Sequence, residues 1–359
     1  MKPVKLGVIG CGVIGSRHLK TAVDLPLIDL VAAADLIEEN RQRASEQFQP
    51  KKVYSSGDEL LDDEEVEAVV LAFPAQHRTE VALQAFAKGK HVLTEKPVAM
   101  IADEVRKMLL ARGELTAACC SSRYRFRKSA DAVTEFITSG GLGDLHVVRC
   151  RAIGAAGKKP DKPGPAWRLT KALNGGGILV NWGCYDLDYL LGITGWSLKP
   201  KTVFAQTWTI PKQFESHIAP GSDAETHYLA TIRCENGCII SIERGEFMPA
   251  QSEHDWQIIG EKGSLKLKMT DFDPRTIIHD DTTTEQGVIS KPLLDREKED
   301  LTLIHSGPLI DFVSAIREKR QPKTNLEQAL IIQEITDAIY ASAARGIAVE
   351  INYLRVLHN

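Results

Sequence analysis

Three glycines near the start of the chain have a spacing that could hold a dinucleotide. The segment GCGVIG places Gly10, Gly12 and Gly15 at G-x-G-x-x-G positions, after the apolar run 4–9 and before a helical pattern at about 13–23. In such a turn one glycine reverses the chain, the next lets the backbone approach a pyrophosphate, and the third lets helix and strand pack closely. Free N–H groups at the helix start, here Val13 and Ile14, face the phosphates. A glycine pattern of this spacing also arises without a ligand, so its context decides.

A carboxylate follows at the distance expected for ribose binding. The second apolar strand pattern, 27–35, ends at Asp35, twenty residues after Gly15. An acidic residue there accepts hydrogen bonds from both adenine-ribose hydroxyls and repels a 2′-phosphate. We therefore predict NAD as the cofactor in preference to NADP. The alternative interpretation of Asp35 is a strand-end cap.

A helical pattern at 175–192 carries a polar stripe beside an apolar face. Asn181, Tyr185 and Asp188 recur at i, i+4 and i+7, so an amide, a phenol and a carboxylate share one side of the predicted helix. The simpler interpretation is a half-buried helix whose polar edge meets water. The alternative is a set of side chains that contact a substrate, although a structural role is favoured for Asp188.

Strand and helix patterns alternate through the first third of the chain. The further runs are helical at 38–48 and 78–88 and extended at 67–73 and 91–97. This alternation predicts βαβ units around a parallel sheet, whose ligands bind beyond the carboxyl ends of the strands. We therefore expect Gly10, Pro74 and the segment Glu95-Lys96-Pro97 to border one crevice.

Beyond residue 145, alternation with a period of two predicts a different sheet. The extended runs lie at 145–153, 201–210, 226–234, 238–246, 255–260 and 264–269. Asn236-Gly237 between two of them is a strong hairpin signal. A long C-terminal helical region is expected to begin at Thr324 or Asn325.

Composition and charge exclude several classes of protein. A chain of 359 residues predicts two domains, and its formal net charge of −4 provides no overall positive field for nucleic acid or acidic lipid. No apolar run approaches the ~20 residues that cross a bilayer, and no signal peptide is recognised. Seven cysteines without a close Cys-x-x-Cys pair indicate reduced thiols in a cytoplasmic protein. Because no group of side chains has metal-ligand spacing, we predict no metal.

Several motifs, taken in order, resemble one enzyme family. They are GCGVIGSRH at 10–18, FPAQH at 73–77, GKHVLTEKP at 89–97, RYRF at 123–126 and GGGILVNWGCYDLD at 175–188. The sequence resembles the glucose–fructose oxidoreductase, inositol dehydrogenase and rhizopine-catabolism family, written Gfo/Idh/MocA. The resemblance implies an α/β fold with an N-terminal Rossmann domain, which we place at 1–123. It also implies a C-terminal α/β domain at 124–359 with a large open, mostly antiparallel sheet, through which a homodimer or homotetramer would form.

The resemblance also implies which residues meet the cofactor. Lys96 of the family's EKP motif would hydrogen-bond the reacting oxygen, and Glu95 would position the cofactor and the lysine. Phe73, Pro74 and His77 match family positions near the cofactor. A lone histidine is nevertheless more often a satisfied polar contact.

The stripe on the 175–192 segment departs from the commonest family pattern. Most relatives resemble Asp-x-Gly-x-His there, whereas this sequence has Asn181 and Tyr185 at those positions. The tyrosine resembles the branches in which a phenol is the acid/base. An unperturbed phenol titrates near ~10, and positive neighbours such as Lys96 and the nicotinamide would favour its phenolate. Asn181 does not titrate, so it is expected to bind a substrate hydroxyl or a structural partner.

Three further side chains are expected to contact substrate. Trp167 and Arg168 precede the glycine loop, as a Trp-Arg pair does in many relatives, and an aromatic plane with a fork of donors suits a sugar ring. Arg123 is a weaker candidate, because it or Arg125 is expected to brace the domain boundary.

These features predict an NAD(P)-dependent oxidoreductase that acts on a carbinol carbon of a sugar, inositol or glycoside, with Lys96 and Tyr185 handling the proton. One alternative is an NAD-retaining glycosidase or lyase of the same fold. Another is a cofactor-binding protein without catalytic activity.

Overall fold

The computed structural model describes residues 2–270 and 275–351, which form two compact units. Among the described residues, the first unit combines those up to Arg123 with 302–333, and the second combines those of 124–301 with 334–351. The predicted assignment of 302–333 to the second domain needs a correction, because this segment belongs to the first unit. The reason is burial: α9 (Leu303–Glu318) places Leu309 and Phe312 in the core of that unit.

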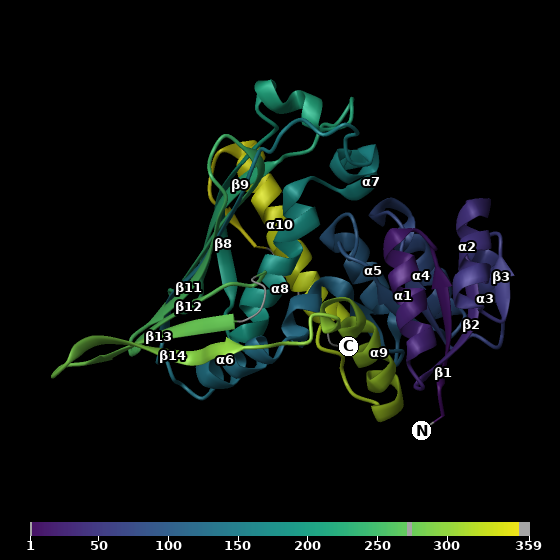
Figure 1. Cartoon of the computed structure of the whole chain (residues 1–359), viewed down its shortest axis with the longest axis horizontal. Helices are drawn as coiled ribbons and strands as arrows, with labels where there is room; N and C mark the ends of the chain where they lie inside the picture. The colour runs from purple at the N-terminus through teal and green to yellow at the C-terminus, as the bar shows by residue number, and fades with distance from the viewer. Residues whose placement is uncertain (1, 271–274, 352–359) are drawn as a thin grey trace. The chain divides into compact units, whose positions relative to one another are not determined.

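The first unit is a six-stranded parallel sheet with helices on both faces (Figure 1). Its strands are β1 (Val4–Ile9), β2 (Ile28–Ala34), β3 (Lys52–Tyr54), β4 (Ala68–Leu71), β5 (His91–Thr94) and β6 (Ala117–Cys119). The strand order is β3-β2-β1-β4-β5-β6, so β2 and β3 are added on one side of β1 and β4, β5 and β6 on the other. This change of side between β3 and β4 is that of a Rossmann fold. The predicted N-terminal Rossmann domain is therefore confirmed.

Two apolar layers hold these helices on the sheet. One layer joins alternate strand residues such as Val8 and Val70 to α1 (Val13–Asp24), α2 (Glu38–Phe48) and α9. The other joins Ile9 and Val69 to the remaining helices, which are α3 (Gly57–Asp62), α4 (Arg78–Ala87), α5 (Ala102–Arg112) and the start of α10 (Leu326–Arg345). Strands covered on both faces read as continuous apolar runs.

The second unit is built on a nine-stranded sheet, which confirms the large, mostly antiparallel sheet predicted there. Its strands are β7 (Leu145–Ala155), β8 (Pro200–Trp208), β9 (His227–Cys234), β10 (Ile239–Met248), β11 (Glu253–Gly260), β12 (Gly263–Leu267), β13 (Arg275–Thr283), β14 (Gly287–Glu297) and β15 (Val349–Glu350). β7 and β10 pair in parallel. Gly237, with φ of 87°, forms the predicted turn between β9 and β10.

The polar stripe lies in the interior of the second unit, so the half-exposed interpretation was wrong. The segment 175–192 forms a π-helical turn, η4 (Leu179–Gly183), which continues as α8 (Cys184–Ile193). Figure 1 shows α8 and α10 beside the same sheet. Asn181, Tyr185 and Asp188 are 4%, 5% and 0% exposed. These side chains therefore do not form the water-facing edge that the half-exposed interpretation required.

Two buried carboxylates of α8 are paired with arginines. Asp188 accepts a hydrogen bond from Arg125, and Asp186 accepts two from Arg244, one of them at 2.7 Å. Arg244 also lies over the Trp182 ring, 4.8 Å from its centroid. Each guanidinium thus gives a buried carboxylate of the α8 segment a charged hydrogen-bond partner in the core.

Breaking one of these pairs is expected to destabilise the protein strongly. Arg244→Met should lower the free energy of unfolding by about 3–5 kcal/mol, because it leaves the Asp186 carboxylate buried and uncompensated. Urea unfolding measures the change. The matched control is Arg151→Met, which removes the surface ion pairs with Glu243 and Glu253 and should change stability by about 1 kcal/mol or less. Equal losses of unfolding free energy in the two variants would show that the buried pair contributes no more to stability than the surface pairs.

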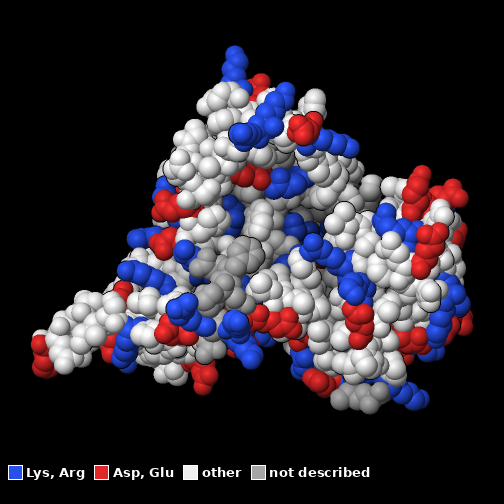
Figure 2. All heavy atoms as spheres, in the orientation of Figure 1, with Lys and Arg blue, Asp and Glu red and all other residues white. Residues whose placement is uncertain are grey.

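The surface shows mixed charge. Figure 2 shows basic and acidic side chains interspersed over the face in view. Within 2–270 and 275–351, no helix is long and apolar enough to cross a membrane.

Candidate functional site

The glycine turn has the shape that a pyrophosphate needs. Gly10 has φ of 91°, and a Cβ on Gly15 would lie 1.8 Å from the Gly10 carbonyl oxygen, so neither position accepts a side chain. A Cβ on Gly12 would meet no described atom within 4 Å. The backbone at Gly12 therefore faces open space at the start of α1, whose first turn contains no acidic residue. These features fit an anionic group at the helix N-terminus.

Asp35 lies beside that turn and is held by the backbone. Its Oδ2 accepts from the Cys11 N–H at 2.6 Å, and its Oδ1 accepts from the Ile37 N–H at 2.8 Å. Each oxygen keeps a second lone pair, so the fixed carboxylate can also accept from two ribose hydroxyls.

Apolar side chains stand exposed around the same place. Val13, Leu36 and Ile37 are 84%, 83% and 56% exposed. Exposed apolar side chains beside the glycine turn suit the flat faces of a dinucleotide. Leu36 and Ile37 were not predicted, although their position directly after Asp35 was a usable signal.

Four strands end level with one another at this edge of the sheet. Ile9 pairs with Ala34 and Leu71, and Leu71 pairs with Thr94. The residues that follow are Gly10, Asp35, Ala72 and Glu95. These strand ends therefore share one edge of the sheet, and the crevice that they were expected to border stays a prediction.

The EKP segment is fixed by its neighbours within the first unit. Lys96 is half-buried, and its backbone N–H donates to Glu95 Oε2 at 3.1 Å. The guanidinium of Arg78, 2% exposed, donates to the carbonyls of Phe73, Glu95 and Pro97 and so ties the ends of β4 and β5 together. Arg78 was missed from the sequence. A basic residue at the start of α4, where the helix dipole disfavours it, was the available signal.

The remaining predicted cofactor residues lie at the same strand ends. Phe73 is half-buried, Pro74 is exposed, and His77 is exposed in the short 3₁₀ helix η1 (Ala75–His77). Their contact with a cofactor stays a prediction.

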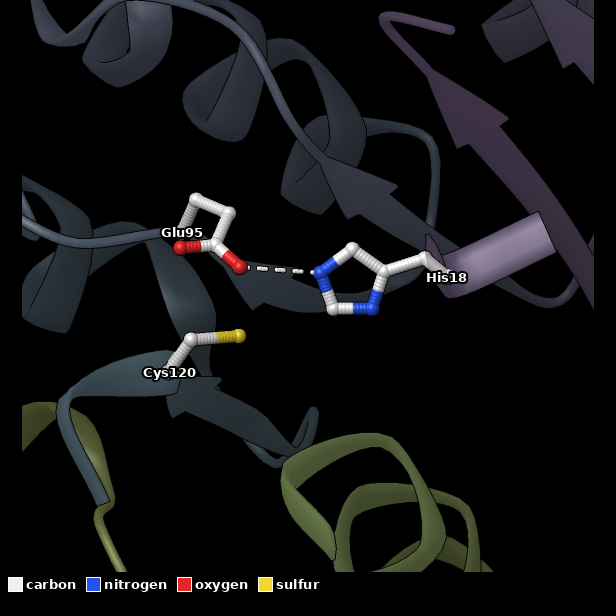
Figure 3. Close-up of side chains that lie close together, drawn as sticks. All are labelled: His18, Glu95 and Cys120. Carbon is white, nitrogen blue, oxygen red and sulfur yellow. Dashed lines mark hydrogen bonds and ion pairs between the residues drawn. The ribbon is translucent and has the colours of Figure 1, made fainter. Parts of the chain in front are cut away.

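A buried cluster surrounds the Glu95 carboxylate (Figure 3). His18 Nε2, from α1, and Arg123 Nη2 each lie 2.9 Å from Glu95 Oε1. The Cys120 thiol points toward the same carboxylate, and ligand atoms of His18, Glu95 and Cys120 lie within 4.8 Å of one another. The Arg123 charge and the His18 hydrogen bond outweigh burial and lower the pKa of Glu95.

Three buried side chains of these types could in principle hold a metal ion. Arg123, however, already places a cation on the oxygen of Glu95 that His18 contacts. Burial, and after it the charge of Glu95, raises the pKa of the Cys120 thiol, which opposes formation of a thiolate ligand. We therefore interpret the cluster as a hydrogen-bonded one.

Arg123 is itself oriented by a histidine of α9. Its Nη1 lies 3.3 Å from His305 Nδ1, and Arg17 contacts the other ring nitrogen. Burial and the two guanidiniums lower the pKa of His305 to about 4, so the ring is neutral at pH 7. The structure thus places Arg123, 6% exposed, against Glu95 and His305. Its contact with substrate stays a prediction.

Tyr185 lies within a group of aromatic rings in the second unit. Its ring centroid is 5.4 Å from that of Tyr124 and 5.7 Å from that of Trp182, both edge-on. The π-helical turn η4 comes directly before α8 and changes the register of the side chains that follow it, a feature frequent at functional sites. Tyr124 and Trp182 were not predicted as neighbours of the phenol.

The other predicted substrate residues lie in one segment of this unit. The Asn181 amide donates to the Arg168 carbonyl at 3.0 Å and accepts from Asn174 at 3.2 Å. Arg168 donates to Glu246 at 2.6 Å, and Trp167 is 41% exposed. Asn181 therefore ties the segment 168–174, which contains the short helix α7 (Lys171–Asn174), to η4.

Replacing Asp35 is expected to change cofactor preference. Asp35→Ala should weaken NAD binding more than NADP binding, on the order of 10-fold, because it removes both ribose acceptors and the repulsion of a 2′-phosphate. Fluorescence titration with NADH and NADPH measures both dissociation constants. An equal loss for the two cofactors would contradict the assignment. Asp29→Ala, which removes an acidic side chain from the opposite end of β2, is the matched control.

Comparisons with known proteins agree with this geometry. Residues 4–120 match the Gfo/Idh/MocA model described as an oxidoreductase family with an NAD-binding Rossmann fold, and residues 131–266 match the C-terminal domain model of the same family.

Similar proteins and structures extend over most of the chain. A D-glucoside 3-dehydrogenase of Escherichia coli is 25% identical over 97% of this chain and 98% of its own length. Inositol 2-dehydrogenase 2 of Saccharopolyspora erythraea is 29% identical over 81% of this chain and 78% of its own. A levoglucosan dehydrogenase structure, in complex with NADH and levoglucosan, superposes with a TM-score of 0.83 at 21% identity, covering 98% of this chain and 100% of that one. At that identity the superposition supports the fold alone.

Proposed function

Because this chain belongs to the Gfo/Idh/MocA family and is an NAD-dependent oxidoreductase, we propose that its substrate is a sugar, polyol or glycoside, oxidised at or reduced to a ring carbinol. Relatives named for a glucoside and for inositol support that class. An alcohol supplied with NAD tests the oxidation, and the corresponding carbonyl compound supplied with NADH tests the reduction.

The observation that carries the proposal is the shared edge of the first sheet. The open backbone at Gly12, the fixed Asp35 carboxylate and the clamped Lys96 follow strands that end level with one another. A cofactor laid along this edge from Asp35 toward β5 brings its reactive end to the EKP segment.

NAD supplies hydride acceptance and donation at nicotinamide C4, and the protein supplies orientation and proton transfer. We assign the proton to Tyr185, whose phenolate oxygen takes it from the substrate hydroxyl during oxidation and becomes the phenol, which returns the proton during reduction. Lys96 Nζ donates a hydrogen bond to the same substrate oxygen and stabilises the alkoxide character that develops there.

The remaining assignments concern the rest of the sugar ring. Trp167 offers an exposed aromatic face and Arg168 a fork of donors, while Asn181 contributes its amide to a hydroxyl or holds the 168–174 segment in place.

We extend the same proposal to a homodimer or homotetramer formed through the open face of the second sheet. Phe204, Trp208 and Leu229 are 55%, 44% and 39% exposed, and they support that role.

A substrate screen tests the function. Purified protein is given NAD, then NADP, with a panel of aldoses, inositols, sugar acids and glycosides, while NADH absorbance and product release are followed together. NADH formed in step with an oxidised product supports the proposal. Glycoside cleavage with catalytic NAD and no NADH accumulation would instead identify an NAD-retaining glycosidase or lyase. Cofactor binding without turnover of any panel member would favour a non-catalytic role.

A further inference from the structure

Glu95 is a buried acid whose surroundings are more elaborate than a strand-end residue requires. It is 4% exposed, and it receives hydrogen bonds from His18, from Arg123 and from the Lys96 backbone. Leaving any buried charge without compensation is costly, so the four groups act as one unit.

The two carboxylate oxygens have separate partners. Oε1 faces His18 and Arg123, each at 2.9 Å, whereas Oε2 accepts the Lys96 N–H at 3.1 Å. A shift of the carboxylate caused by losing a partner of Oε1 would therefore move the backbone of Lys96 with it.

The imidazole of His18 adds a second observation. The residue is 2% exposed, and its Nδ1 is buried with no hydrogen-bond partner in the described structure. A proton on Nδ1 would be an unsatisfied buried donor, so the geometry favours the tautomer with its proton on Nε2, which donates to Glu95. The hydrogen bond to Glu95 is therefore the one that the described structure gives this ring.

We propose that His18 and Arg123 are positioning residues for the reaction: they hold the Glu95 carboxylate against the Lys96 backbone and so fix the EKP lysine at its reacting position. The proposal rests on the proposed role of Lys96. It also gives Arg123 an indirect role through Glu95, in place of direct contact with substrate.

The titratable and charged groups that the described structure places around Glu95 enter the expected pH dependence. They are His18 from α1, Arg123 and Cys120 from the segment η2 (Cys120–Phe126), Arg78 from α4 at the Glu95 carbonyl, the adjacent Lys96, and Arg17 and His305 behind Arg123. Arg123 and His18 keep the pKa of Glu95 depressed, so the carboxylate stays ionised well into the acid range. Removing either group raises the pKa of Glu95. The acid limb of the pH profile then moves to higher pH, because the carboxyl group protonates earlier as the pH falls.

Two variants of one residue separate positioning from simple packing. His18→Leu removes the donor, whereas His18→Gln places an amide N–H the same number of bonds from the backbone as Nε2. With D-glucose, methyl glucoside or myo-inositol, whichever the screen finds active, His18→Leu should lower kcat on the order of 10- to 100-fold. It should also move the acid limb of the pH profile to higher pH, while the affinity for NADH stays within about 3-fold of the wild type. His18→Gln should recover most of kcat and return the acid limb of the pH profile to its wild-type position.

Arg123→Met and Arg123→Lys repeat the test on the other partner, with the charge-preserving variant expected to keep the acid limb in place. His91→Leu is the control, because it removes another histidine of the first unit that bonds the backbone of Thr116 instead of Glu95. It should leave kcat and the profile unchanged.

The outcomes separate this proposal from the function on which it rests. If His18→Leu binds NADH normally with an unchanged kcat and acid limb while Lys96→Met is inactive, the positioning role is wrong and the function stands. If Lys96→Met itself retains full turnover, the proposed function fails first. If His18→Leu does not fold, the pH profiles of His18→Gln and of the two Arg123 variants decide. An unshifted acid limb in Arg123→Met then contradicts the proposal.

Discussion

Tyr185→Phe is expected to lower kcat by about 10²–10⁴-fold, the range that a positioned general acid/base contributes. The substitution removes one oxygen atom and keeps the ring, whose edge-on contacts with Tyr124 and Trp182 fix its orientation. NADH affinity, measured by fluorescence titration, should stay within about 3-fold of the wild type. Steady-state turnover on the substrate found by the screen gives the rate.

Tyr189→Phe is the matched control for this variant. Tyr189 lies one turn further along α8 and is 2% exposed, so the same atom is removed from the same helix at comparable burial. It should retain most of the activity. Full turnover in Tyr185→Phe would remove the phenol from the mechanism, and equal losses in both variants would indicate a packing defect of α8.

Lys96→Met is expected to lower kcat by about 10²–10³-fold, because it removes the donor that we assign to the developing alkoxide. Methionine approximates the length of the lysine stem and leaves the backbone N–H that Glu95 accepts. The loss should therefore appear in kcat at unchanged thermal stability. Lys88→Met, which removes a partly exposed ammonium paired with Asp62, serves as the control.

A second measurement on Lys96→Met separates its role in chemistry from one in cofactor binding. If NADH affinity falls by the same factor as turnover, the lysine contributes to holding the cofactor. An unchanged affinity together with the lost turnover supports the assignment to the reacting oxygen.

Much of the first unit follows from local pattern. The glycines and Asp35 were found from sequence because each follows an apolar strand, and parallel strands end at one edge. The role predicted for Lys96 of the EKP segment came from the family resemblance. The short strand β3 and the helices α3 and α5 were not predicted, since Lys52–Tyr54 has only three residues and neither helix carries a pronounced apolar stripe.

The interior of the second unit was less accessible to such reasoning. The polar stripe on α8 suggested exposure, but Arg125 and Arg244 arrive from η2 and β10 to compensate Asp188 and Asp186. A single helix cannot reveal partners that come from other elements. For the same reason α9 could not be assigned to the first core, because its apolar face shows that it packs but not where.

The Glu95 cluster shows a similar limit. His18, Cys120 and Arg123 are separated by up to 105 residues in the sequence, and nothing in their spacing indicates a shared carboxylate. The fold brings them together because α1 and η2 both lie near the end of β5.

Deuterium transfer tests the central claim most directly. The substrate found by the screen is labelled at its ring carbinol carbon, incubated with NAD, and the nucleotide is examined by mass spectrometry. Our account predicts that the label appears in NADH in stoichiometric amount with the oxidised product. Oxidised product formed without deuterium in the nucleotide, or label lost to solvent, would contradict it.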